Sequence, residues 1–560
     1  MQGNPAGALH HALSPRISLI AALFVFLSYI YFFQIYGNFV STNEFSRFLL
    51  TSAMVDDGTI RIDEAMRRLG ETADKAAYNG HFYSDKAIGL SLMAVPPYIA
   101  LKWVCAFFEI VPETPSILFY LRVVCVTVPF LLLVPLLVRF WREILPDSQA
   151  VAGVTFLFLF GTIAFTYAVQ FVSNALAGMF LFASFDCLYR ARRHEAAQDR
   201  RLFLAGALAG FSVLLEYTAA VAVVLLSVYA VRAAPFRKIV FRYGCGLAVC
   251  LAALMAYNTA IFGTPFDLTY HHMADQPHRE ELSRGFLGFS PSAAVLFRIL
   301  FGSDRGLFYF CPVLLLSVPG FFYFMKRREL RAEAWLFLAI PACTAFGIAG
   351  MGNWHAGWSF GPRYLTPVVP FLMTAVLFAL SEPDFAHGTF LHWLAAVLGG
   401  LSIIVVAAGT ITFPFAFPEM RDPVFHLTIP LFLRGDFSKN LGESLGLPAH
   451  VSALFFCALV AAAGIFGVAS PPDWRNRARS VARWLLVALI SIGALAARYA
   501  SIQETPFDTF LRGYACYYTG DYRNALSDLK EAWDGTQDRN LRNLIGFRAE
   551  QVRSKLSASR

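Results

Sequence analysis

Charged residues are scarce in this sequence of 560 residues: they make up 15% of it, whereas 57% is hydrophobic and the mean hydropathy is +0.54. A soluble domain normally carries about 25% charged residues, so the composition excludes an ordinary soluble protein. Apolar runs of the length that a spanning helix needs, about 20 residues, recur from Ile17 to Tyr499. We therefore expect an all-α polytopic membrane protein.

Several common signatures are also missing. The nine cysteines include no CxxC pair, and eight lie in apolar segments, which excludes a disulfide framework and a usual zinc site; Cys516 alone is expected in water. No P-loop and no GxGxxG after a strand is present, so no nucleotide cradle is expected. The apolar run after residues 1–16 is long enough to span and lacks a small-residue cleavage site, so it should remain as the first helix.

The basic residues, which give a net charge of +8, occur in short blocks between apolar runs. The blocks are RFWR (139–142), RARRHEAAQDRR (190–201), RAAPFRK (232–238), KRRELR (326–331) and RNRARSVAR (475–483). Cytoplasmic loops of membrane proteins are enriched in Lys and Arg, so we place all five blocks in the cytoplasm with residues 1–16. The pattern orients a membrane protein and gives no reason to expect a nucleic-acid partner.

With this orientation, residues 17–499 contain about 13 spans, two of which form a hairpin that turns near Glu216-Tyr217. The outer side then receives a first loop at 37–116, a second at 263–305, and the tail at 500–560. The run at 87–107 contains Pro96, Pro97 and Lys102 and would break the alternation, so we expect a juxtamembrane helix at the outer interface. The alternative is a further span that places RFWR outside.

The first outer loop opens with STNEFSRFLL, in which Glu44 and Arg47 share one face of a short helix that Thr42 or Asn43 can cap. Another face is expected to meet lipid; it consists of Phe45, Phe48, Leu49 and Ala53. The alternative for Glu44 and Arg47 is a solvated ion pair on an interfacial helix.

Two further cations lie at the expected outer edge. Lys86 follows Asp85 just before the juxtamembrane helix, where an ammonium group is suited to a lipid phosphate. Arg122 lies a few residues into an apolar helix, and an ionisable residue in a span indicates a functional site. For both residues the alternative is snorkelling to the lipid head groups.

The segment GNWHAGWSFGPRYLTPVVPF (352–371) places Arg363 outside, beside His355, Trp358 and Tyr364. Its glycines allow a ligand to approach the backbone, and arginine offers a fork of donors to a phosphate; the alternative is an interfacial aromatic belt. In the second outer loop, His271 and His272 with Asp275 and His278 match no specific zinc spacing. We therefore expect no metal there.

The motifs NEFSR, YSDKAIG and WSFGPRYLTPVVPF, with the large first loop and the 13-span layout, resemble the GT-C superfamily of glycosyltransferases. The members compared are the bacterial aminoarabinose transferase and protein O-mannosyltransferase families. The resemblance implies a cell-envelope enzyme that transfers a sugar, with inversion, from a polyprenyl-phosphate donor to the hydroxyl of a glycan, glycolipid or protein. The tail would lie in the periplasm or outside the cell.

The resemblance also implies roles for single residues. Glu44 is the expected catalytic carboxylate, although the family opens this loop with an Asp-Glu pair and this chain has Asn43-Glu44. The expected phosphate ligands are Lys86, Arg363 and Arg122. The expected substrate-lining residues are Asn43, Arg47, Asp85, His355, Trp358, Tyr364, His271 and His272. The acid that aminoarabinose transferases carry after TYAV falls near Asn174, so it is absent here.

The tail segment 510–535 resembles the tetratricopeptide pattern, a helix pair packed through small residues such as Gly513 and Ala525. One repeat is too few to stand alone, so we expect it to dock on the membrane domain or on a protein partner; the alternative is a plain helical hairpin.

Two other functions of the whole protein remain open. A transporter or flippase of lipid-linked sugars favours charges deep in the bundle, and an assembly protein would work through the tail.

Overall fold

The structure is a computed structural model that describes residues 15–37, 41–193, 197–275, 290–382, 389–468 and 474–558. The first outer loop holds α2 (Thr42–Asp56), α3 (Asp63–Leu69), β1 (Lys75–Tyr78), β2 (His81–Ser84) and α4 (Gly89–Phe107). The longer helices around it are α1 (Pro15–Ile30), α5 (Thr114–Arg122), α6 (Val128–Ile144), α7 (Ser148–Phe160), α8 (Ile163–Ala168), α9 (Asn174–Arg193), α10 (Gln198–Leu215), α11 (Ala220–Ala230), α13 (Gly244–Phe262), α15 (Ala293–Phe301), α17 (Ser317–Lys326), α18 (Arg331–Ala349), α19 (Val369–Ser381), α21 (Thr389–Ile411), α22 (Ile429–Arg434), α24 (Ala449–Val468) and α25 (Trp474–Ala500).

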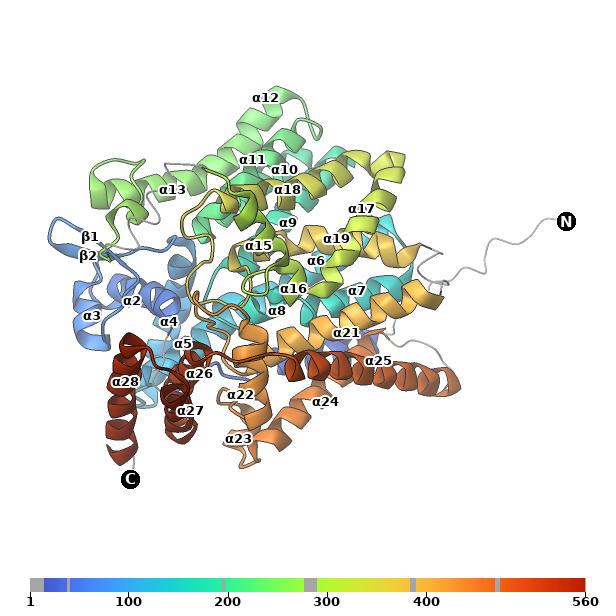
Figure 1. Cartoon of the computed structure of the whole chain (residues 1–560). Coiled ribbons are helices and arrows are strands. Elements are labelled where there is room, and N and C mark those ends of the chain that lie inside the picture. The colour runs from blue at the N-terminus through green and yellow to red at the C-terminus, as the bar shows by residue number, and fades with distance from the viewer. Residues whose placement is uncertain are drawn as a thin grey trace.

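These helices run between two chemically different ends of the molecule (Figure 1). At one end, ion pairs join the basic segments: Arg139 of α6 binds Asp186 of α9 at 2.6 Å, and Arg192 of α9 binds Glu333 of α18 at 2.9 Å. At the other end, Asn174 at the start of α9 binds Glu216, which follows α10, at 3.1 Å. We call these the basic end and the outer end; α2, α3 and the strands lie at the outer end with the C-terminal helices.

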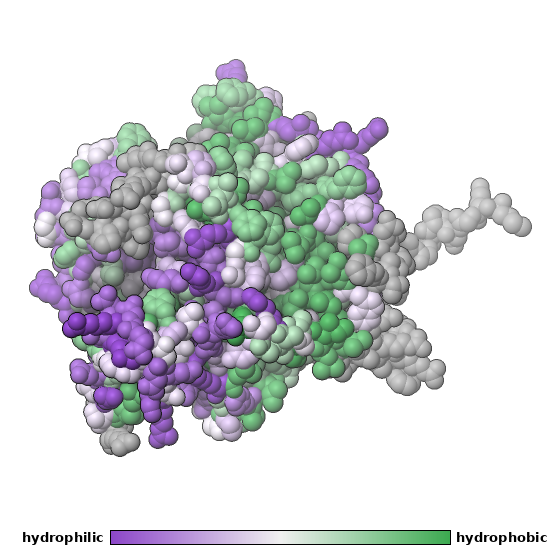
Figure 2. Space-filling view, viewed as in Figure 1, coloured by the Kyte–Doolittle hydropathy of each residue, from purple (hydrophilic) through white to green (hydrophobic). Residues whose placement is uncertain are grey.

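Six helices among the described residues are long and apolar enough to cross a membrane: Gly89–Phe107, Thr114–Ile144, Phe236–Phe262, Arg328–Ala349, Arg363–Ser381 and Trp393–Ile411. Shorter apolar helices accompany them, and Figure 2 shows hydrophobic surface over the helical body, with polar surface over the first outer loop and the C-terminal helices. The chain is a multi-pass membrane protein. The count of 13 spans and the cytoplasmic side of the basic end stay predictions.

The predicted helix break at Glu216-Tyr217 is confirmed. Helix α10 ends at Leu215, the short 3-10 helix η3 (Tyr217–Ala219) follows, and α11 begins at Ala220. The Gln198 side chain at the start of α10 donates to the carbonyl of Ala233 beyond the end of α11, at 3.1 Å. The two helices therefore form a hairpin whose turn lies at the outer end.

Helix α4 packs along the outer end. Its Lys102 pairs with Asp56 at the end of α2, and its Pro97 carbonyl accepts a hydrogen bond from Tyr120 of α5 at 3.3 Å. Beyond these contacts the chain exposes large apolar side chains, including Trp103 at 74% and Phe107 at 81%. Such exposure is expected where a helix meets lipid. The length and composition of α4 also allow a span, and its interfacial placement stays a prediction.

The first outer loop differs from the sequence expectations in two ways. The all-α expectation did not include a β-hairpin, and β1 and β2 form one in which Tyr78 pairs with His81. Its turn, Asn79-Gly80, has φ of 49° and 78°, as the favoured Asn-Gly hairpin turn requires. The expected lipid-facing side of helix α2 is wrong, since every residue from Asn43 to Ala53 is buried within the protein.

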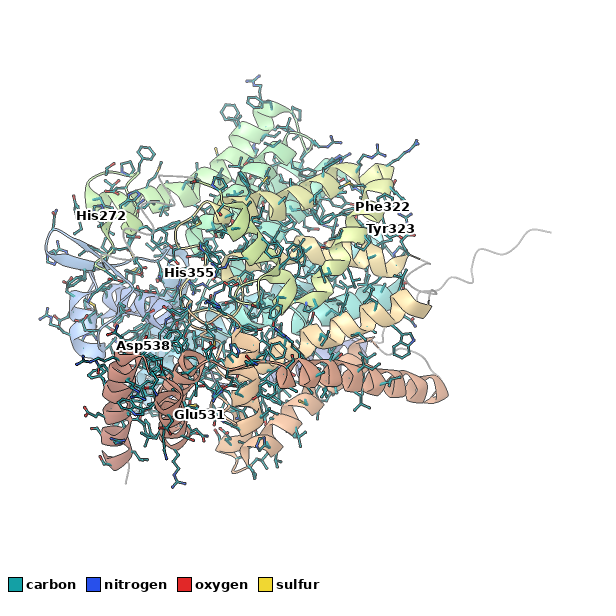
Figure 3. The ribbon with its side chains drawn as sticks, viewed as in Figure 1. His272, Phe322, Tyr323, His355, Glu531 and Asp538 are labelled. Atoms are coloured by element: carbon teal, nitrogen blue, oxygen red, sulfur yellow. The ribbon has the colours of Figure 1, made fainter. Side chains whose placement is uncertain are left out.

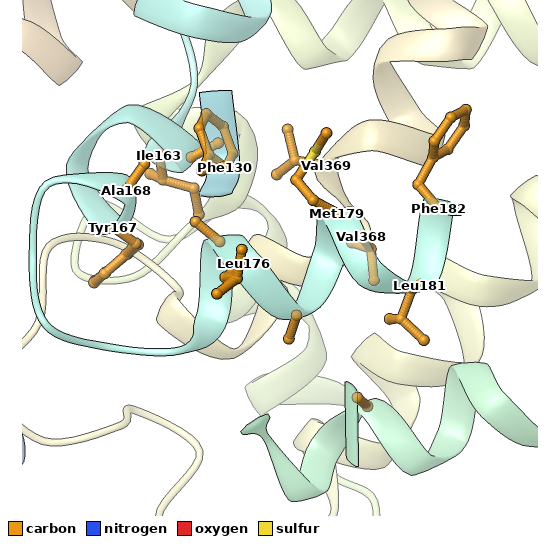
Figure 4. Close-up of a cluster of buried hydrophobic side chains, with 14 of the residues drawn as sticks. Phe130, Ile163, Tyr167, Ala168, Leu176, Met179, Leu181, Phe182, Val368 and Val369 are labelled. Atoms are coloured by element: carbon orange, nitrogen blue, oxygen red, sulfur yellow. The ribbon is translucent and has the colours of Figure 1, made fainter. Parts of the chain in front are cut away.

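Close packing fixes the helices that carry the outer end. Figure 4 shows Leu176, Met179 and Phe182 of α9 in a buried apolar cluster with Val368 and Val369 at the start of α19. Helices α10 and α13 approach more closely still, because Gly206 and Gly246 lack side chains at their contact. A Cβ on Gly206 would lie 1.9 Å from the carbonyl oxygen of Tyr243.

The tail forms α26 (Pro506–Thr519), α27 (Tyr522–Gly535) and α28 (Arg539–Ala558). Gly513 lets α26 approach α27, since a Cβ there would lie 3.0 Å from the Cβ of Asp528. Asp528 is fully buried and binds Arg434 of α22 through two hydrogen bonds of 2.6 and 2.7 Å. The tail is therefore docked on the outer end. Cys516, expected in water, is buried in this contact; the tetratricopeptide likeness stays a prediction.

The close approach of α10 and α13 predicts a strong effect of one methyl group. Gly206→Ala must push the helices apart, and overpacking of this kind costs about 1–3 kcal/mol. We expect a lower melting temperature for the detergent-solubilised protein, measured by thermal denaturation followed by size-exclusion chromatography. Gly153→Ala in α7 is the control, because a Cβ there meets nothing within 4 Å; equal melting temperatures for the two variants would contradict the packing argument.

Candidate functional site

Glu44 and Arg122 form a buried, bidentate ion pair. The Arg122 Nε donates to Glu44 Oε1 at 2.8 Å and its Nη2 donates to Oε2 at 2.7 Å. The Nη1 of Arg122 also donates to the carbonyls of Phe33 and Gln34, at 2.8 and 2.7 Å. Glu44 is 0% and Arg122 is 5% exposed. Two residues singled out separately in the sequence are thus each other's partners.

Glu44 has a further donor, the backbone N–H of Phe171, at 2.5 Å from Oε1. This bond holds the connection between α8 and α9 in place. Ser173 and Asn174 follow Phe171 in the chain. Both of these side chains donate to Oε2 of Glu216, at 3.3 and 3.1 Å. The ion pair therefore supports, through one backbone contact, the residues that bind Glu216.

A second group of polar side chains lies at the outer end, and we call it the polar cluster. It consists of Arg47, Asp74, Asp85, Lys86, Glu216, Tyr270, Arg363 and Tyr364. Electrostatic interactions link them: Glu216 interacts with Arg47, Tyr270, Arg363 and Tyr364, and Asp85 with Arg47 and Tyr270. The cluster brings together five of the predicted site residues, namely Arg47, Asp85, Lys86, Arg363 and Tyr364.

Lys86 is held between two carboxylates. Its Nζ lies 2.7 Å from Asp85 Oδ2 and 2.8 Å from Asp74 Oδ2. Burial raises the pKa of Asp85, against the effect of Lys86. Burial alone would lower the pKa of Lys86, but Asp74 and Asp85 raise it above its ordinary value. Lys86 is therefore charged, and its charge is already balanced within the cluster.

Arg47 and Arg363 differ from Lys86, because neither makes an ion pair with a carboxylate of the described residues. Arg47 donates from Nε to Asn43 Oδ1 and from Nη1 to the Ala87 carbonyl, each at 3.1 Å. Burial lowers the pKa of Arg47, while Glu216 raises it and Arg363 lowers it further. Arg363 begins the 3-10 helix η8 (Arg363–Val368), is partly exposed, and lies over the ring of Tyr364. Both guanidiniums thus keep donor capacity for a ligand.

Sequence reasoning did not select three members of the polar cluster, namely Asp74, Tyr270 and Glu216. The most informative of them is Glu216. Its place at the turn between α10 and α11 was recognised, but a single carboxylate at a helix break carries no motif. The partner that identifies it, Asn174, is 42 residues away in the sequence. The available signal was the combination of an outer-edge turn with an acidic residue in an apolar surrounding.

Arg305, which is 1% exposed, holds the segment 352–363 in place through backbone hydrogen bonds. Its guanidinium donates to the carbonyls of Asp304, His355, Gly357 and Ala416, at 2.8 to 3.2 Å. His355 accepts the Gly357 N–H at 3.0 Å through Nδ1. Trp358 packs on Phe417 and on Tyr514 and Tyr518 of the tail. These contacts of His355 and Trp358 hold the segment 352–363 together and tie it to the tail.

His271 and His272 both bind Asp267. The His271 Nδ1 and the His272 Nε2 each lie 2.8 Å from one oxygen of that carboxylate. The ring of His272 also stacks on Phe262, with ring centroids 4.6 Å apart. Figure 3 shows His272 beside the β-hairpin, well away from His355. The described residues contain no group of three side chains able to hold a metal ion; His278 lies outside them.

Comparison with known proteins gave similarity to solved structures only. No family model matches the chain, and no curated protein matches it. The crystal structure of ArnT from Cupriavidus metallidurans bound to undecaprenyl phosphate is similar over 85% of this chain and 76% of that chain, with 13% identity and a TM-score of 0.47. ArnT in the apo state covers the same shares with 13% identity and a TM-score of 0.43.

A likeness at this level of identity and TM-score carries no argument about function. The function of this chain is inferred from its own residues.

The ion pair of Glu44 predicts the effect of its removal. Glu44→Gln leaves the Arg122 guanidinium buried without a counter-charge, which typically costs about 3–5 kcal/mol. We expect a clearly lower melting temperature and less protein in the membrane. The double variant Glu44→Gln/Arg122→Gln should regain part of the stability, because no charge is then left unpaired. A Glu44→Gln protein as stable as wild type would show that the pair does not support the fold.

The tail contact predicts a pH dependence. Burial, followed by the neighbouring Asp521, raises the pKa of Asp436 from an ordinary 3.8 to about 7. The docked state therefore holds this proton more tightly than the undocked state. The contribution of Asp436 to the stability of the docked state is fully present below pH 3.8 and is lost as the pH rises toward 7. We expect a protease to cut residues 501–505 faster at pH 8 than at pH 5, with rates normalised to a peptide substrate.

Asp436→Asn, which keeps the shape of the protonated acid, should reduce this difference. His426 adds to the effect in the same direction: burial lowers its pKa, but Asp508, with an oxygen 3.4 Å away, raises it overall, so this ion pair is also lost as the pH rises. An Asp436→Asn protein with the full wild-type pH response would contradict the assignment to Asp436.

Proposed function

We propose that the protein is an integral membrane glycosyltransferase. It transfers a sugar from a polyprenyl-phosphate donor to an acceptor hydroxyl at the outer end, on the periplasmic or extracellular side of the cell membrane, with inversion at the anomeric carbon. The acceptor is a glycan, a glycolipid or a protein. The N-terminus lies in the cytoplasm and the tail lies on the outer side.

The observation that carries the proposal is the pair of guanidiniums in the polar cluster. Arg47 and Arg363 interact electrostatically and make no ion pair with a carboxylate of the described chain. The formal charges of the cluster sum to zero without a ligand. Its three cationic residues are Arg47, Lys86 and Arg363, and its three acidic residues are Asp74, Asp85 and Glu216. However, among the described residues none of these carboxylates makes an ion pair with Arg47 or Arg363, so the arginine donors remain available to phosphate oxygens, which guanidinium groups bind in a bidentate manner.

The chemistry follows from this arrangement. The acceptor oxygen attacks the anomeric carbon while the bond to the phosphate oxygen breaks, and negative charge grows on the departing lipid phosphate. Arg363 and Arg47, together with Lys86, offset that negative charge. Arg122 is a weaker candidate for phosphate contact, because Glu44 and two carbonyls take four of its N–H donors. Glu44 then acts by holding Arg122 and Phe171 in place.

Arg363→Gln tests the proposal. In a strain lacking the native copy, wild type should restore a sugar on an envelope glycan, glycolipid or protein, as read by mass spectrometry. Arg363→Gln, matched for protein level, should lower the initial rate of that transfer at least tenfold, since it removes charge that acts in the transition state. It should also weaken the thermal stabilisation of the purified protein by undecaprenyl phosphate.

Lys102→Gln serves as the matched control, because Lys102 pairs with Asp56 and belongs to no part of the polar cluster. Normal transfer by Arg363→Gln would contradict the proposed phosphate site. A transporter or flippase would give a different result: the lipid-linked sugar would change membrane side, and no new glycosidic bond would depend on the protein.

A further inference from the structure

Four carboxylates at the outer end are candidates for contact with the acceptor: Glu44, Asp74, Asp85 and Glu216. Three of them bind a cation directly. Glu44 is paired with Arg122 at 2.7 Å, and Asp85 and Asp74 share Lys86 at 2.7 and 2.8 Å. A carboxylate that already binds a cation is less available to accept a proton from an acceptor hydroxyl. Each of these three carboxylates is therefore already occupied by a cationic side chain.

Glu216 is different. It is 6% exposed, and it makes no ion pair among the described residues. Its two hydrogen-bond donors, Ser173 Oγ and Asn174 Nδ2, are neutral and both bind the same oxygen, Oε2. No hydrogen bond to Oε1 is made within the described chain. One oxygen of this carboxylate is thus fixed, and the other is available.

The position of Glu216 also fits contact with substrate. It interacts electrostatically with Arg47 and Arg363, the two arginines proposed to bind the donor phosphate, and with Tyr270 and Tyr364. It lies at the turn of the α10–α11 hairpin, where the chain leaves helical geometry with φ of −152° at Glu216 itself. A carboxylate in such a turn is held by the helices on both sides, and it lies within electrostatic reach of the arginines proposed to hold the leaving group.

We propose that Glu216 is the catalytic base of the transfer. This rests on the proposed glycosyltransferase function. As the acceptor oxygen forms its bond to the anomeric carbon, the hydroxyl proton passes to Glu216 Oε1, and the electron pair of the breaking bond leaves with the lipid phosphate. Ser173 and Asn174 keep the carboxylate oriented through Oε2, so Asn174 is a positioning residue. Glu44 supports the same group indirectly through Phe171.

The test compares Glu216→Gln, Glu216→Asp and the control Glu71→Gln, whose carboxylate is 74% exposed and outside the cluster. General base catalysis typically contributes 10²–10⁴-fold. We expect Glu216→Gln to lower the initial rate of sugar transfer in the deletion strain at least 100-fold. Stabilisation by undecaprenyl phosphate, measured on the purified protein, should stay within twofold of wild type. Glu216→Asp should retain an intermediate rate, and Glu71→Gln the full rate.

The outcomes separate this inference from the function on which it rests. If Glu216→Gln transfers sugar at more than half of the wild-type rate, Glu216 is not the base although the transferase stands. If Glu216→Gln instead loses stabilisation by undecaprenyl phosphate as Arg363→Gln does, Glu216 shapes the phosphate site and the assignment as base is overturned. If wild type neither transfers a sugar nor is stabilised by undecaprenyl phosphate, the proposed function itself fails.

Should Glu216→Gln not fold, the decision falls to Glu216→Asp and Asn174→Leu. Both keep an acid at position 216 but misplace it, so the transfer rate should fall while stabilisation by undecaprenyl phosphate is unchanged. A merely structural role would instead lower the melting temperature of both variants and leave the rate per folded molecule as in wild type.

Discussion

The outer end of the molecule depends on the buried ion pair between Arg122 and Glu44. Removing two charges from water costs several kcal/mol each, and their attraction compensates only where the remaining donors and acceptors are satisfied. Here the carbonyls of Phe33 and Gln34 and the N–H of Phe171 supply those partners. The pair therefore exists only when the segment after α1, helix α2, helix α5 and the α8–α9 connection come together.

The polar cluster lies beside this junction, and two asparagines hold it together. Asn43 accepts from Arg47 and Asn174 donates to Glu216, each at 3.1 Å. An aspartate at 43 would pair with Arg47 and cancel its charge, and an aspartate at 174 would bring two carboxylates into contact. Both asparagines thus preserve Arg47 as an unpaired cation and Glu216 as an unpaired anion. The asparagines at positions 43 and 174 and the carboxylate of Glu216 therefore have one common explanation, which the motifs viewed separately do not give.

The sequence supported the membrane class, the break at Glu216-Tyr217 and the helical tail, because apolar length, charge blocks and small-residue spacing are local signals. It also contains the Asn79-Gly80 turn, a strong hairpin signal that the all-α expectation does not include. The burial of α2 was not predictable, since a hydrophobic face packs equally well on lipid or on protein. The pairing of Glu44 with Arg122 was not predictable either, because the contact joins residues 78 positions apart.

The tail belongs to this outer end and is not an appendage. Its residues Phe510, Leu511 and Ala525 share one apolar core with Phe417 and Leu431 of the segment that precedes α24. Asp528 pairs with Arg512 inside the tail and with Arg434 on that same segment, so one buried carboxylate joins the tail to the outer end. The tail also meets Gly37, where a Cβ would lie 3.1 Å from Gly520 Cα, and Trp358. These contacts touch the chain just before Glu44 and just before Arg363, so the tail restrains both segments from which the candidate site is built.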